Sequence, residues 1–91
     1  MAKHFEELWE DAEKASANRP TNRQELYIAL EQEIKEYAKL DSIPSKDIQN
    51  ILKSKKLGEI LFKISELSRL DNINTFAALQ LEVQIAEKMT Q

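Results

Sequence analysis

The chain of 91 residues contains no cysteine, one glycine and two prolines. Without cysteine, neither a disulfide framework nor a thiolate zinc site is available to stabilise the fold. Scarce glycine and proline, with abundant alanine, leucine, glutamate and lysine, predict a nearly all-helical chain. No apolar run approaches the roughly 18–20 residues of a membrane span, and the acidic start of the chain lacks a signal peptide's apolar core. We therefore expect a cytoplasmic protein with no membrane contact.

The charge balance and the length set further limits. A net charge of −3 and a pI near 5.2 argue against nucleic-acid partners, because phosphate backbones attract basic surfaces. A chain of this size forms one domain and buries only about 60–65% of the surface that its unfolded chain exposes. We expect a single helical domain over residues 1–91, with an N-terminal helix and loop at 1–21 and a helical core at 22–91. Such a small core favours a homo-oligomer.

Hydrophobic periodicity and turn residues predict four or five helices. They span about 3–16, Thr21 to about 40, a short stretch after Ser45, about 55–70, and Thr75 to about 88. Thr21 with Gln24 has the form of a capping box, and Ser45 and Asn74 are expected to cap later helices. Residues 53–56 leave open whether the third and fourth helices are continuous.

The last predicted helix carries two apolar rows. One row contains Phe76, Leu79, Val83 and Ala86, and the other contains Ala78, Leu81, Ile85 and Met89. A helix with two apolar faces needs neighbours on more than one side, which favours packing between subunits over a central helix of a monomer. We expect subunit contacts at Phe76, Leu79, Val83 and Ile85.

One carboxylate falls inside an apolar helical stripe. Leu26, Leu30, Ile34 and Tyr37 line one face of the second helix, and Glu33 projects close to the centre of that face. A buried carboxylate takes up a proton, pairs with a cation or binds a metal. The residues leave two alternatives for Glu33: an ion pair with Lys56 or Lys63 of a neighbouring helix, or a metal site. Glu36 and Glu59 are either solvated helix surface or further ligands.

Several short segments carry a resemblance to a known family. Residues 32–36 read Gln-Glu-Ile-Lys-Glu, residues 56–62 read Lys-Leu-Gly-Glu-Ile-Leu-Phe, and Leu-Ser-Arg at 67–69 precedes Thr-Phe-Ala-Ala-Leu at 75–79. In order and spacing this resembles the MazG-like all-α nucleoside triphosphate pyrophosphohydrolases. Their motifs run Glu-Glu-x-x-Glu, Glu-Leu-Gly-Asp-Leu-Leu-Phe, Leu-Ala-Arg and an Ala-Leu-containing helix. The resemblance covers about residues 22–88 and implies a MazG-like bundle of four to five helices.

The resemblance also implies a site. In that family the motif acids hold Mg²⁺, which neutralises phosphoanhydride charge and activates a water. Carried over, Glu33, Glu36 and Glu59 are the metal ligands, and Lys56 contacts a phosphate. Gln32 and Lys56 stand where the family has acids, and the C-terminal basic residues are reduced to Lys88. No catalytic residue is assigned.

Two functions follow from these departures. The first is a helical protein with an incomplete acidic metal site, inactive or weakly active, that serves as an interaction or regulatory module. The alternative is a Mg²⁺-dependent enzyme that cuts a nucleoside triphosphate to a monophosphate and pyrophosphate. The loss of motif acids favours the first, because catalysis of this type depends on positioned metal charge.

Overall fold

The computed structural model describes residues 4–17 and 22–89, and this part of the chain forms helices and no strand. The elements are α1 (Phe5–Ser16), α2 (Arg23–Lys39), a 3₁₀ turn η1 (Leu40–Ser42), α3 (Lys46–Asp71) and α4 (Thr75–Met89). The all-α prediction is confirmed. α3 is one helix of 26 residues, and it contains both stretches whose continuity the sequence left open. Residues 53–56 contain neither glycine nor proline, so nothing interrupts the helical hydrogen bonds there.

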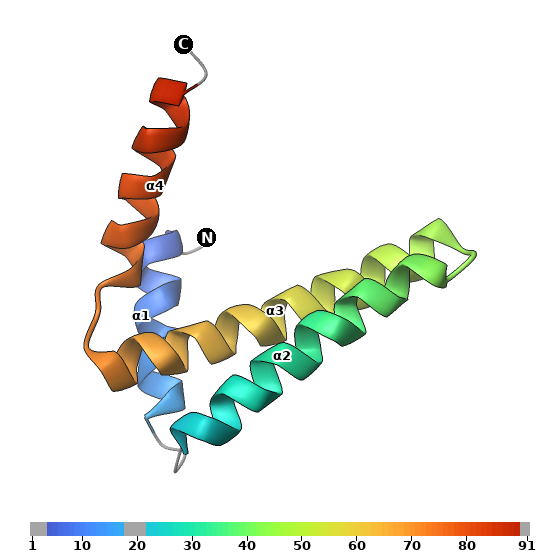
Figure 1. Ribbon diagram of the computed structural model, residues 1–91, viewed down its shortest axis with the longest axis horizontal. Helices are drawn as coiled ribbons and strands as arrows, with labels where there is room; N and C mark the ends of the chain where they lie inside the picture. Colours follow the sequence, from blue (N-terminus) through green and yellow to red (C-terminus); the bar gives the residue numbers. More distant parts are fainter. Residues whose placement is uncertain (1–3, 18–21, 90–91) are drawn as a thin grey trace.

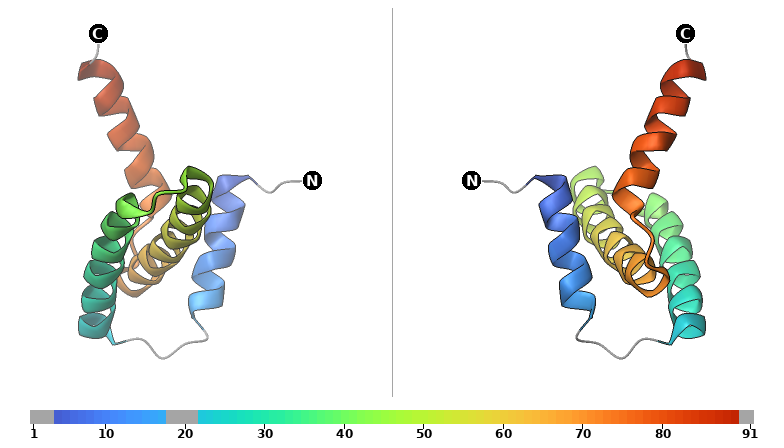
Figure 2. Two further views of the ribbon diagram at one scale, coloured as in Figure 1. Left: turned by 90° about the vertical axis from the view of Figure 1, so that its right-hand side faces the viewer. Right: turned by 90° about the vertical axis from the view of Figure 1, so that its left-hand side faces the viewer.

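The helices form an antiparallel hairpin with two attached helices. α2 and α3 pack side by side along their length, joined at one end by η1 and Pro44 (Figure 1). α1 packs on the C-terminal half of α3, while α4 leaves the end of α3 and runs away from the hairpin (Figures 1 and 2). α2 and α3 therefore form the two-helix interface on which the motif residues lie.

Side-chain caps set the helix ends. The Ser45 hydroxyl accepts from the Ile48 amide at 3.4 Å, and the side-chain Oδ1 of Asn74 accepts from the Ala77 amide at 3.0 Å, so both cap predictions are confirmed. The predicted cap Thr21 lies outside the described residues. The observed N-cap of α2 is Asn22, whose Oδ1 accepts from the amides of the second and third helical residues.

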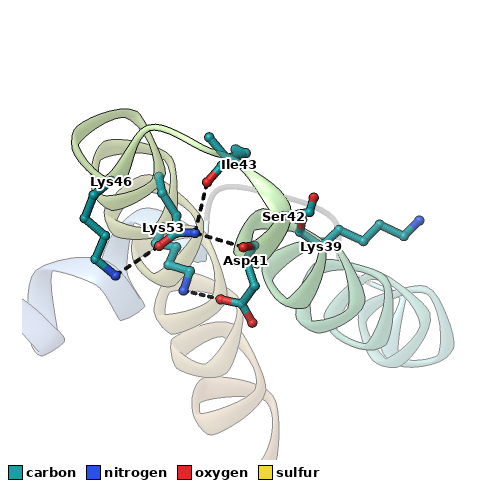
Figure 3. Close-up of polar contacts among 7 residues, drawn as sticks. Lys39, Asp41, Ser42, Ile43, Lys46 and Lys53 are labelled. Atoms are coloured by element: carbon teal, nitrogen blue, oxygen red, sulfur yellow. Dashed lines mark hydrogen bonds and ion pairs between the residues drawn. The ribbon is translucent and has the colours of Figure 1, made fainter.

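Gln49 stabilises the tip of the hairpin, where Asp41, Ile43 and Lys46 come together (Figure 3). Its buried amide nitrogen donates to the Asp41 carbonyl at 3.1 Å and to the Ile43 carbonyl at 3.4 Å. Lys46 Nζ donates to Gln49 Oε1 at 3.1 Å. These bonds satisfy two carbonyls of the turn that have no helical partner, and they fix the direction in which α3 returns along α2.

Polar contacts hold α1 on α3. Ser16 is fully buried, and its hydroxyl accepts from Arg69 Nε at 3.0 Å. Ser68 Oγ donates to Glu13 Oε1 at 3.1 Å. At the other end of α1, the Phe5 ring stacks on Trp9, with centroids 5.8 Å apart. The bonds of Glu13 and Ser16 therefore fix the C-terminal half of α1 to α3, whereas the ring contact lies within α1.

The single chain has a small apolar core. Among the described residues, only Trp9 and Leu26 are buried hydrophobics, whereas sixteen large hydrophobic side chains are exposed. The exposed set is spread over all four α-helices and includes Leu8, Ile28, Leu61 and Leu81. No helix in the described ranges is long and apolar enough to cross a membrane.

Candidate functional site

The motif residues meet along the α2–α3 interface. Glu33 and Glu36 lie one turn apart on α2, and residues three apart share a helix face. Lys56, Glu59 and Lys63 repeat at intervals of three and four residues along the facing side of α3. The two helices thus place an acidic row opposite a row that contains two lysines.

Glu33 is paired with Lys63. Lys63 Nζ lies 2.8 Å from Glu33 Oε1, and the exposed fraction of the Glu33 side chain is 13%. Of the two partners that the sequence allowed, the structure selects Lys63. The second carboxylate oxygen, Oε2, is buried and accepts no hydrogen bond from any described residue. The ion pair compensates the charge of Glu33 but leaves one of its acceptor oxygens unused.

Lys56 bridges the other two predicted metal ligands. Its Nζ lies 3.1 Å from Glu36 Oε2 and 3.1 Å from Glu59 Oε2, so one ammonium group joins α2 to α3. The hydrogen bond from Lys56 lowers the pKa of Glu36, and Gln32 adds a smaller contribution. The same ammonium lowers the pKa of Glu59, and the two carboxylates together raise the pKa of Lys56. All three groups are therefore held in their charged forms at neutral pH.

This donor set does not fit Mg²⁺ as it stands. Mg²⁺ needs carboxylate oxygens and waters in near-octahedral geometry, and it is repelled by a neighbouring ammonium. Each of the three acids already contacts a lysine, and no group of three or more Asp, Glu, His or Cys side chains in the described ranges is arranged to hold a metal ion. Glu36 and Glu59 do come together as the resemblance implies, but Lys56 lies between them.

Lys53 also makes its contacts within the chain. Its ammonium pairs with Asp41 and lies 5.4 Å from the centroid of the Tyr37 ring. The pairing with Asp41 raises the pKa of Lys53, and that of Asp41 is lowered in turn. The side chains of Lys53 and Lys56 are each only one-fifth exposed, so these two lysines are largely internal to the hairpin, whereas Lys55 between them is exposed.

The predicted subunit-contact residues lie on α4. Phe76 is half-buried and stacks on Phe5, with ring centroids 6.1 Å apart. Leu79, Val83 and Ile85 are exposed. Beyond Phe76, every described residue of α4 is exposed, so the described part of the chain leaves the rest of both apolar rows uncovered.

An apolar cleft between α1 and α3 was not predicted from the sequence. Its volume is about 380 Å³, and it is lined by Phe5, Leu8, Trp9, Asp11, Ala12, Gly58, Leu61 and Phe62. A Cβ atom built on Gly58 would meet nothing within 4 Å, so the floor of the cleft is open there. Phe5, Leu8 and Trp9 form its α1 side, and its α3 side depends on how the two helices cross.

Comparison with protein family models, with curated proteins and with solved structures gives no match. The MazG-like resemblance therefore rests on the motif residues themselves. What the site can do has to be argued from its geometry, and that geometry is a set of lysine–carboxylate contacts across two packed helices.

Proposed function

We propose that this chain is a MazG-like helical interaction module in which lysine ammonium groups supply the positive charge that a metal ion supplies in the enzymes it resembles. One observation carries the proposal: Lys56 Nζ lies 3.1 Å from a carboxylate oxygen of both Glu36 and Glu59. An ammonium in that position neutralises the motif acids and links α2 to α3 without any metal.

Electrostatics supports this reading. Two unit charges 4 Å apart interact by about 4 kcal/mol at an effective dielectric constant of 20. A divalent cation next to Lys56 would meet a repulsion of at least that order, and it would also have to displace the ammonium from both carboxylates. Lys63, which pairs with Glu33, places a second ammonium group at the same interface.

The role as an interaction module is supported by the surface. Sixteen large hydrophobic side chains are exposed in the described ranges, against two hydrophobics that are buried. Monomeric proteins rarely expose large contiguous apolar patches, and such surfaces mark contact sites for other proteins. The exposed apolar side chains, which include both rows of α4 beyond Phe76, support a role in protein contacts.

The second candidate is the Mg²⁺-dependent pyrophosphohydrolase that the resemblance implies. Glu33 Oε2 is buried and has no hydrogen-bond partner within the described part of the chain, which leaves one acceptor oxygen unused on the residue one helical turn from Glu36. In this reading Lys56 leaves the carboxylates and contacts a phosphate of the nucleoside triphosphate. The module proposal requires no such rearrangement.

Thermal melts and a pyrophosphate-release assay test the proposal. We expect the melting temperature of the unmodified chain to be unchanged by Mg²⁺ or Mn²⁺, because ligand-linked stabilisation requires binding to the folded state. Glu33→Gln should lower the free energy of unfolding by about 1–3 kcal/mol, since it leaves Lys63 without its charge partner at a partly buried site. Glu31→Gln is the matched control, because Glu31 makes an exposed pair with Lys35.

No pyrophosphate should be released from any of the common ribo- or deoxyribonucleoside triphosphates. A metal-dependent rise in melting temperature that disappears in Glu33→Gln, with pyrophosphate released from even one nucleotide, would replace the module proposal with the enzyme.

A further inference from the structure

We draw no further inference here: the strongest candidate, the exposed apolar face of α4 from Leu79 to Met89, carries nothing, because no contact within the described part of the chain shows what covers it.

Discussion

At the scale of single residues, the side chain of Lys56 decides what the motif acids can do. Its ammonium holds the pKa of Glu36 and that of Glu59 below their ordinary value of 4.5. It is itself held charged, with a pKa above 10.5. A lysine at this position converts a pair of potential metal ligands into a bridge between two helices.

The bridge predicts a pH profile of stability. Because the pKa values of Glu36 and Glu59 are lowered in the folded state, their contribution is complete above about pH 4.5 and is lost as the pH falls through the folded values. The pKa of Lys56 is raised, so its contribution is complete below about pH 10.5 and is lost as the pH rises through the folded value. The free energy of unfolding should therefore be highest between these limits.

In Lys56→Met, the free energy of unfolding should rise instead of fall as the pH drops below neutral. Without the ammonium, Glu36 and Glu59 become neighbouring like charges, so their folded pKa values rise and protonation stabilises the fold. Urea unfolding at pH 7 and pH 4.5 measures the change. We expect Lys56→Met to gain stability on acidification relative to Lys88→Met, whose lysine lies on α4 and outside the bridge. Equal acid profiles for the two variants would mean that Lys56 does not hold these carboxylates in solution.

At the scale of elements, the hairpin tip depends on one amide side chain. Gln49 is buried and donates to the carbonyls of Asp41 and Ile43 (Figure 3). Gln49→Ala should lower the free energy of unfolding by about 1–3 kcal/mol, because it leaves two carbonyls of the turn without these donors. Asn50→Ala, at the adjacent exposed position, should change it by less than about 0.5 kcal/mol. Chemical denaturation of both variants checks this, and equal effects would contradict the role of Gln49.

The helices themselves could be predicted largely from local chemistry. Ser45 and Asn74 act as caps because a hydroxyl or amide oxygen at that position satisfies a free helical amide, which depends on nearby residues alone. Asn22 was missed in favour of Thr21 because both are good caps one residue apart. The continuity of α3 across 53–56 could not be decided, since lysine and serine are compatible with either outcome.

The site was predictable only in part. The helical periodicity of the sequence placed Glu33 on an apolar face and indicated a cation opposite it. It could not decide between Lys56 and Lys63, because these residues lie seven positions apart on the same face of α3. Which lysine faces Glu33 depends on the offset between two helices, which the turn around Gln49 sets. The α1–α3 cleft depends on a crossing between separate elements and left no local pattern in the sequence.

At the scale of the whole molecule, the shortage of buried apolar area predicts an obligate oligomer. Val83→Asp should reduce the particle mass to that of a monomer and lower the melting temperature, because a charge in the interface remains uncompensated at a cost of at least about 2 kcal/mol. Gln84→Asp introduces the same charge at the adjacent position, outside both apolar rows, and should have little effect. Light scattering that shows a stable monomer of the unmodified chain at low micromolar concentration would contradict this prediction.

Calorimetric titration with Mn²⁺ tests whether the Lys56 ammonium takes the place of a metal ion between Glu36 and Glu59. The unmodified chain should show no saturable binding, since Lys56 bridges Glu36 and Glu59. Lys56→Glu restores the acid that the MazG-like motif has at this position, and we expect it to bind Mn²⁺ and to be stabilised by the metal. Stoichiometric Mn²⁺ binding by the unmodified chain that is lost in Glu33→Gln would contradict the account.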